Sequence, residues 1–218
     1  MTENVKPRRR YDSRRRRQQA DQTRDDVIDA ARGLLLDLGY AGTTIGAIAD
    51  AAGVSPETIY KSFGGKPGLV RAIWVKSLEG AGPVPAEERS DAIRATELDP
   101  RSLIRAWGGF VTEVAARVAP IALLIRAAAA SDVRMAELLA EVDQQRLQRM
   151  ETNARGLFER GDLRSDLTLE DARDIMWTWS SPESYELLVI RRGWSAERFG
   201  SLAAEQMIAA LLPRGSDA

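Results

Sequence analysis

Basic side chains that could bind phosphate are concentrated at the N-terminal end of the chain. Among residues 1–24, nine lysines and arginines stand against three acidic residues, a net charge of +6 (nine minus three), although the whole chain carries −1. The densest run is Arg14, Arg15, Arg16 and Arg17. Clustered cations can neutralise DNA phosphates and release their counterions, whereas an evenly neutral surface gains little from DNA. The run therefore indicates a nucleic-acid contact, and a solvated tail is the alternative.

Three acidic residues in the C-terminal half could do a different kind of chemistry. Glu137, Glu141 and Asp143 lie close together and could act in acid–base catalysis or hold a hard metal ion. The chain has no histidine and no cysteine, which removes the usual general base, thiolate nucleophiles and the commonest ligands of transition metals. Carboxylates at such spacings on an amphipathic helix are usually solvated, and no phosphate-binding loop or nucleophile motif supports them. The sequence favours a protein that is not an enzyme and has no catalytic residue, metal site or cofactor.

A third set of residues has the spacing of a helix-turn-helix. Such a unit needs a small residue where two helices cross, a turn residue that tolerates positive φ, and an apolar residue that faces back from the second helix. Ala49, Gly53 and Ile59 meet these needs, with Ile48 and Val54 adding apolar packing. The triplet alone also occurs by chance, so its weight depends on the helices around it.

The surrounding elements are expected to be helices throughout. Apolar residues recur at helical spacing, and no segment alternates with the period of two that strands require, so the predicted fold class is all-α. A first helix is expected from Thr23 to a C-terminal glycine cap at Gly39, and Thr44 should cap a short helix over 45–51. Ser55 and Pro56 should then open the next helix.

The predicted domain organisation places a small DNA-binding domain before a larger helical bundle. After residue 100, helices are expected to about residue 118, with a break at Pro120, and then over 121–130, 132–160, 168–179, 183–192 and 196–212. Glycine, proline and charge are frequent over residues 80–99, which favours a loop. The expected units are a basic disordered arm (1–22), a three-helix helix-turn-helix domain (23–80), a linker or loop (81–99) and a ligand-sensing and dimerisation domain (100–213).

The stretch from Thr43 to Lys66 resembles the DNA-binding signature of the TetR family of transcriptional regulators. That signature ends in tyrosine, two variable positions, phenylalanine, a small turn and lysine, which Tyr60, Phe63, Gly64-Gly65 and Lys66 match. One departure is Ser62, where the family commonly has histidine or tyrosine. The resemblance is strong over residues 23 to about 75.

The resemblance implies that residues 56–62 form a recognition helix in the major groove of DNA. The implied DNA-binding residues are Thr44, Ser55, Pro56, Glu57, Thr58, Tyr60, Lys61, Ser62 and Lys66, joined by Arg14 to Arg17 of the arm. Those early in the recognition helix and Lys61 would lie nearest base edges or phosphates, whereas Thr44, Tyr60 and Lys66 would hold phosphates. The alternatives are that Tyr60 fills the core, that Glu57 is a favourable acid in a first helical turn, and that Lys61 is merely solvated.

The C-terminal half resembles the sensing domain of many actinobacterial TetR-like regulators, which implies a ligand pocket inside one helical bundle. The residues expected to line it are Trp107, Phe110, Leu124, Phe158, Trp177 and Trp179. Their aromatic character would suit a flat or lipophilic ligand, and ordinary core packing is the alternative.

The last two predicted helices carry more apolar surface than one bundle needs, which indicates a twofold dimer. The residues assigned to this interface are Tyr185, Leu188, Val189, Phe199, Leu202, Met207 and Leu211. Twofold symmetry would pair two recognition helices and call for a pseudo-palindromic operator.

These interpretations together describe a ligand-responsive repressor that a small lipophilic or aromatic effector releases from its operator. The expected partners are double-stranded operator DNA, the effector and a second copy of the chain. No run of 18 apolar residues and no signal peptide is evident, so a cytoplasmic protein without a membrane partner is expected. The alternative function is a non-specific nucleic-acid binder driven by the basic arm.

Overall fold

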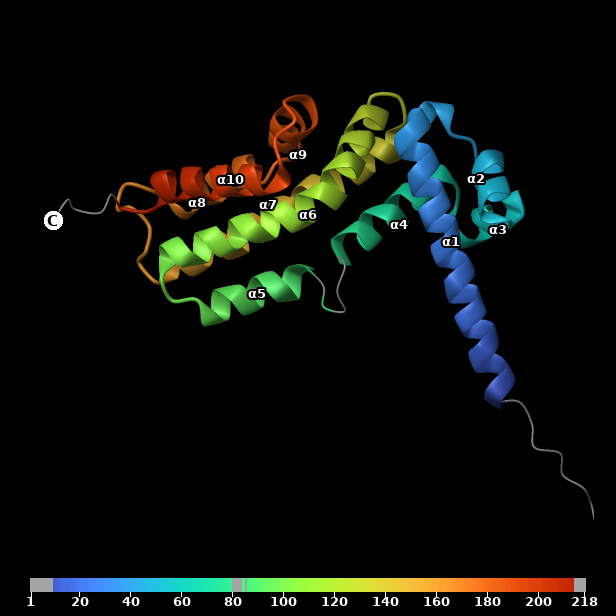
Figure 1. The fold of residues 1–218 in the computed structure, drawn as a ribbon, viewed down its shortest axis with the longest axis horizontal. Coiled ribbons are helices and arrows are strands. Elements are labelled where there is room, and N and C mark those ends of the chain that lie inside the picture. The colour runs from blue at the N-terminus through green and yellow to red at the C-terminus, as the bar shows by residue number, and fades with distance from the viewer. Residues whose placement is uncertain (1–9, 80–83, 85, 214–218) are drawn as a thin grey trace, which may run out of the picture. The chain divides into compact units, whose positions relative to one another are not determined.

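The computed structural model describes residues 10–79, 84 and 86–213, and these residues form helices joined by short connections (Figure 1). The predicted all-α fold class is confirmed. The helices are α1 (Arg10–Gly42), α2 (Ile45–Ala52), α3 (Pro56–Phe63), α4 (Lys66–Glu79), α5 (Ala86–Thr96), α6 (Pro100–Ala129), α7 (Val133–Glu159), α8 (Leu169–Trp179), α9 (Pro182–Tyr185), the π-helical turn η1 (Glu186–Arg191) and α10 (Ala196–Leu211).

The chain divides into two compact units, Met1–Ile73 and Trp74–Ala218. The boundary lies inside α4, whereas the sequence placed the end of the DNA-binding domain at residue 80. Composition predicts a boundary where glycine and proline are frequent. The two units of the structure are instead defined by which residues are in contact. Residues Lys66 to Ile73 of α4 belong to the first unit, and the rest of this helix belongs to the second.

The first helix is longer than the sequence predicted. It begins at Arg10 rather than Thr23, and the Thr23 hydroxyl donates to the Gln19 carbonyl (2.9 Å) instead of capping an N-terminus. The predicted disordered arm is therefore helical from residue 10 onward, and its residues 1–9 lie outside the described residues. The C-terminal cap predicted at Gly39 is a kink in the structure, because this glycine has φ 74° and α1 extends beyond it to Gly42.

Residues 86–96 of the predicted linker form α5. The helix packs along α6, where the Arg89 guanidinium donates to the Glu113 carboxylate (2.6 Å) and lies over the Phe110 ring. Arg117 also donates to Glu113, and these two hydrogen bonds hold the pKa of Glu113 below its usual value. The loop prediction was wrong because the contacts that hold α5 come from a distant helix, which local composition does not reveal.

The long helix α6 continues through Pro120, where the sequence predicted a break. Proline lacks the N–H that would bond to the preceding turn. The neighbouring residues Val118, Ala119, Ile121 and Ala122 are all buried, so packing holds the helix on both sides of the missing bond.

The same helix is long and apolar enough to cross a membrane, with a window of mean hydropathy 1.6, although the sequence alone suggested no such run. It packs against α5, α7, α9 and α10, and helices at the core of a bundle have the same apolar composition.

Two glycines allow α6 and α10 to approach closely. A Cβ on Gly108 would lie 2.7 Å from both the Gly200 carbonyl oxygen and the Ala204 Cβ. Gly200 has as little room, since a Cβ there would lie 2.5 Å from the Gly108 carbonyl oxygen. The Thr112 hydroxyl bridges the two helices at this crossing, because it lies 3.1 Å from the Gly108 carbonyl of α6 and 3.2 Å from the Ala196 carbonyl of α10. Only glycine fits at either position of this crossing.

We expect Gly108→Ala to lower the free energy of unfolding by about 1–3 kcal/mol, because the added methyl forces α6 and α10 apart. Gly109→Ala is the matched control, since a Cβ there meets nothing within 4 Å. Alanine at this position should stabilise the helix by about 0.5–1 kcal/mol. Urea unfolding followed by circular dichroism measures both changes, and equal stabilities of the two variants would contradict the close crossing.

Candidate functional site

The first unit contains the predicted helix-turn-helix. Helices α2 and α3 are joined by a turn in which Gly53 adopts φ 65° and the Val54 amide donates to the Ala49 carbonyl (3.0 Å). Ala49, Ile48 and Ile59 are fully buried, so the small and apolar positions face inward as the spacing predicts. The turn and the buried side chains together orient α3.

Two of the predicted DNA-binding residues cap these helices. The Thr44 hydroxyl accepts from the Ala47 amide (3.1 Å) at the start of α2, and the Ser55 hydroxyl accepts from the Thr58 amide (3.2 Å) at the start of α3. Both residues are exposed. Each fixes where its helix begins and leaves the positive end of the helix dipole at the surface.

The outer face of α3 is polar and open to solvent. The exposed residues along it are Pro56, Glu57, Thr58, Tyr60, Lys61 and Ser62. Tyr60 is 57% exposed, so it does not fill the core, which was the alternative interpretation. The predicted recognition helix thus presents two hydroxyl groups, a phenol, a carboxylate and a cation, and its apolar residue Ile59 anchors it from behind.

The structure places Lys66 differently from the sequence prediction. Its ammonium group donates to the carbonyls of Tyr40 and Thr43, the latter at 2.9 Å, and lies 4.2 Å from the centre of the Tyr40 ring. These contacts hold the C-terminal end of α1 against the start of α4. The ammonium group that the sequence assigned to phosphate is therefore bound inside the unit. It donates to carbonyls that lack a donor at the end of a helix.

Arg24 is a residue that the sequence alone did not single out. Its guanidinium lies over the Phe63 ring at 4.5 Å and donates to the Ser62 carbonyl (3.5 Å). It therefore connects α1 to the C-terminal end of the exposed helix α3. The sequence shows a basic residue, Arg24, and an aromatic residue, Phe63, at the end of the motif. Their spacing along the chain does not reveal that the two side chains are in contact.

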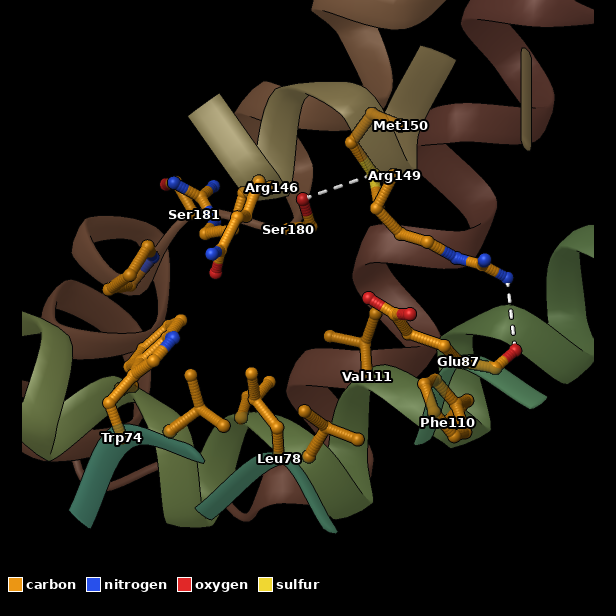
Figure 2. A pocket seen from close by; sticks show the side chains of 16 residues that line it. Trp74, Leu78, Glu87, Phe110, Val111, Arg146, Arg149, Met150, Ser180 and Ser181 are labelled. Atoms are coloured by element: carbon orange, nitrogen blue, oxygen red, sulfur yellow. Dashed lines mark hydrogen bonds between the residues drawn. The ribbon is translucent and has the colours of Figure 1, made fainter. Parts of the chain in front are cut away.

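The second unit contains a partly open cavity of about 160 Å³ (Figure 2). Its walls come from the C-terminal part of α4, from α5, α6 and α7, and from the junction of α8 and α9. The lining residues are Trp74, Leu78, Glu87, Phe110, Val111, Val114, Ala115, Val118, Ala119, Gln145, Arg146, Arg149, Met150, Ser180, Ser181 and Pro182. The cavity is mainly apolar, with polar side chains on α5, α7 and the α8–α9 junction and the indole nitrogen of Trp74 on α4.

The two lining arginines are held by protein acceptors. Arg146 donates to the Trp177 carbonyl (3.2 Å) and to Asp143 (3.4 Å), and burial lowers the pKa of its guanidinium. Arg149 donates to Asp91 (2.6 Å), which holds the pKa of that carboxyl below its usual value. The guanidinium groups therefore brace α7 against α5 and α8.

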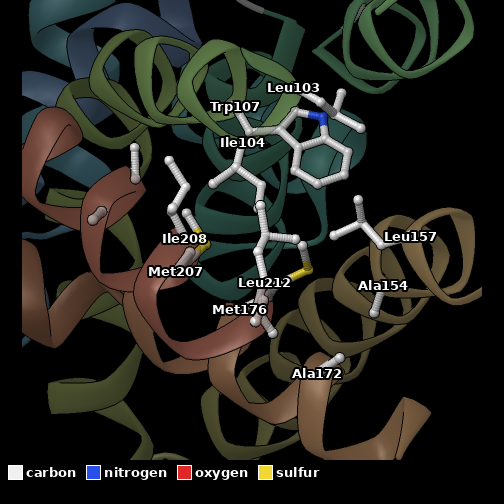
Figure 3. Close-up of a cluster of buried hydrophobic side chains, with 13 residues drawn as sticks. Leu103, Ile104, Trp107, Ala154, Leu157, Ala172, Met176, Met207, Ile208 and Leu212 are labelled. Carbon is white, nitrogen blue, oxygen red and sulfur yellow. The ribbon is translucent and has the colours of Figure 1, made fainter. Parts of the chain in front are cut away.

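The cavity corrects most of the predicted pocket. Phe110 lines it, but Trp107 belongs to the buried cluster formed by α6, α7, α8 and α10, shown in Figure 3, and Trp179 packs against that cluster. Phe158 is 50% exposed. Trp177 stacks on Arg146, and Leu124 is half-buried on α6 outside the lining. Aromatic character does not reveal whether a side chain is exposed, packed in a core or facing a void, because only the fold decides this.

The predicted dimer residues also need correction. Phe199, Met207 and Leu211 are buried in their own unit, and Tyr185 packs edge-on against Phe199 with ring centres 5.5 Å apart. The half-buried members are Leu188, Val189 and Leu202. The largest apolar exposure in this region is at residues outside the predicted set, Leu187 (55%) and Ile190 (53%) of η1. Periodicity cannot distinguish a face buried within a protomer from one buried between protomers.

The acidic residues considered for catalysis lie along α7. Asp143 accepts from Arg126 and Arg146, each at 3.4 Å, so it belongs to an ion-pair cluster. Glu141 accepts from Gln145 one turn away, and Glu137 is exposed. Among the described residues, no group of three or more acidic side chains is arranged to hold a metal ion.

Comparison with known proteins gives a family match within the first unit. Residues 27–73 match the family described as bacterial regulatory proteins, tetR family. The HTH-type transcriptional regulator AlkX of Mycobacterium tuberculosis is 46% identical over 48 residues, which are 22% of this chain and 23% of that protein. Curated relatives at 36% identity or more are matched over only 23–36% of their own lengths.

Solved structures resemble the fold of most of the chain. The structure titled SmeT–triclosan complex has a TM-score of 0.69 at 20% identity and covers 89% of this chain and 93% of its own. FadR from Bacillus subtilis in complex with stearoyl-CoA has a TM-score of 0.69 at 17% identity and covers 84% and 97%. At these identities the likeness concerns the fold alone.

We expect Lys66→Met to lower the free energy of unfolding by about 1.5–3 kcal/mol, because it removes a charged donor from two carbonyls at the end of α1. Lys61→Met is the matched control, since Lys61 is exposed on α3, and should change stability by less than about 0.5 kcal/mol. Urea unfolding of the full chain measures both. If the Lys66 variant were as stable as the Lys61 variant, the internal role of this ammonium would be wrong.

Proposed function

We propose, from the match of residues 27–73 to the tetR family of bacterial regulatory proteins, that the protein is a ligand-responsive transcriptional repressor. It binds operator DNA in the cytoplasm as a homodimer and leaves the operator when a small lipophilic or aromatic effector binds. The observation that carries the proposal is α3, a short helix anchored by Ile59 whose whole outer face is exposed and polar.

The exposed face of α3 suits the major groove of DNA. Thr58 and Lys61 can contact base edges or phosphates, and the Tyr60 hydroxyl and the N-terminus of α2 at Thr44 can hold phosphates. Glu57 would be repelled by phosphates unless it accepts from a cytosine amino group. Base contacts determine the sequence that is read, and phosphate contacts set the register of the helix on the duplex.

The exposed arginines of α1 add affinity without sequence choice. Arg14 to Arg17 lie on a helical segment, all exposed, where they can follow the phosphate backbone or enter a minor groove. Driven by these charges alone, the protein would be a non-specific nucleic-acid binder, which is the second candidate function.

A dimer would pair two α3 helices across a pseudo-palindromic operator. The exposed Leu187 and Ile190 and the half-buried Leu188, Val189 and Leu202 are the apolar side chains available for this interface. We expect the second copy to cover them, because exposed apolar residues close together favour association.

The effector would bind in the cavity of the second unit. The similar SmeT structure holds triclosan and the similar FadR structure holds stearoyl-CoA, which supports a lipophilic ligand here. Trp74 and Leu78 line the cavity from α4, and the same helix supplies residues 66–73 of the DNA-binding unit. Release from the operator can be no larger than the difference in the effector's affinity for the two states.

Titration of the protein against DNA from its own upstream region and against a scrambled duplex tests the proposal. Fluorescence anisotropy at two salt concentrations should give a preference of about 10³ or more for one pseudo-palindromic site. Equal and salt-sensitive affinities would leave the non-specific binder, and an absence of binding to either duplex would overturn both candidates.

We expect the combined substitutions Arg14→Ala, Arg15→Ala, Arg16→Ala and Arg17→Ala to weaken binding to operator and scrambled DNA by similar factors. The slope of log affinity against log salt should become shallower by about 0.9 for each DNA phosphate that these arginines neutralise. Alanine preserves the helix, and the pair Gln18→Ala and Gln19→Ala is a control on the same segment without a charge change. An unchanged slope would exclude the arm from DNA binding.

A further inference from the structure

We propose that the cavity of the second unit takes an uncharged apolar molecule about the size of one aromatic ring, carrying an oxygen that accepts a hydrogen bond from the Trp74 indole N–H. The inference rests on the proposed function, because it names the chemical class of the effector. Three observations carry it: the size and lining of the cavity, the state of the Trp74 nitrogen, and the pairing of the nearby charges.

The size of the cavity fits a single ring. Its volume of about 160 Å³ is close to the roughly 150 Å³ of an engineered apolar cavity that binds benzene, although the cavity here is partly open to solvent. The apolar wall is formed largely by α6, with Phe110, Val111, Val114 and Val118 facing the space, and by Leu78 of α4. Burial of a ring against these side chains supplies affinity but little orientation.

The Trp74 indole supplies the orienting group. The residue is 3% exposed, and its Nε1 is buried with no hydrogen-bond partner among the described residues. Figure 2 shows this nitrogen on the side of the ring that faces the cavity. A buried donor without an acceptor carries a desolvation penalty, so a ligand oxygen placed there relieves a cost already present in the empty protein.

The charges around the cavity do not call for a charged ligand. Arg146 is held by Asp143 and the Trp177 carbonyl, and Arg149 by Asp91. Glu87 also lines the cavity, but it is an exposed residue, and pairing an exposed carboxylate with a cation contributes little. The Ser180 hydroxyl is within hydrogen-bond distance of the Met150 sulfur and the Trp177 carbonyl. Trp74 therefore provides the lining polar atom that is buried and unpaired.

A pair of isosteric probes tests the hydrogen bond directly. Acetophenone and α-methylstyrene have the same shape, but only acetophenone has an acceptor oxygen in place of the terminal methylene carbon. Isothermal titration of the full chain should give about tenfold tighter binding of acetophenone, the ratio expected from satisfying one buried donor. Without that bond, the more apolar α-methylstyrene should bind as tightly or more tightly.

Two tryptophan variants assign the preference to one atom. Trp74→Phe keeps an aromatic ring and removes the N–H, so the tenfold ratio should fall to about one or reverse. Trp107→Phe is the matched control, because the Trp107 nitrogen is also buried and unpaired but belongs to the core cluster outside the lining. This variant should keep the preference, and circular dichroism verifies that both variants fold.

Three results would overturn the inference: equal binding of the two probes by the unchanged protein, a preference that survives in Trp74→Phe, or failure of both probes to bind up to their solubility. The operator titration separates this failure from that of the proposed function. A protein that binds its operator but shows no probe preference remains a regulator with another effector class. A protein that prefers acetophenone but binds no DNA has the ligand site without the regulatory role.

Discussion

The close crossing of α6 and α10 at Gly108 and Gly200 is the constraint on which the second unit depends. With no side chain on either helix at the crossing, the backbones meet, and Thr112 ties the Gly108 turn to the first turn of α10. Helix α6 is thereby held over its length as the element against which α5, α7, α9 and α10 pack. The cavity follows from the same arrangement, since the part of α6 beyond the crossing forms its longest wall.

In the first unit, the constraint is that a very short helix, α3, must be held in place while most of it is exposed. A helix of eight residues is marginal by itself, so α3 needs support from outside. Ile59 anchors it from behind, Gly53 sets the turn before it, and the Ser55 hydroxyl accepts from the Thr58 amide in its first turn. Lys66 supports the scaffold by satisfying carbonyls at the end of α1. The exposed polar side chains along α3 are then available to a partner.

Helix α4 contributes residues to both units. Its first residues are counted with the first unit, and its last turns place Trp74 and Leu78 in the wall of the cavity. A ligand that satisfies the Trp74 N–H would therefore act on a helix that also belongs to the unit carrying α3. The free energy available for such an effect is that of differential binding to two states, which a single buried donor can supply in part.

The sequence by itself determined the features that depend on neighbouring residues. Helical periodicity gave the fold class, and the positive-φ glycine, the hydroxyl caps and the small and apolar positions located α2, the turn and α3, because each acts within a few residues along the chain. The tertiary structure alone decided which buried aromatics face a void, why α5 is a helix, why α6 survives Pro120, and that Phe199 and Met207 pack inward. These outcomes depend on contacts between residues far apart in the chain, and a hydrophobic pattern records that a face is buried but not what covers it.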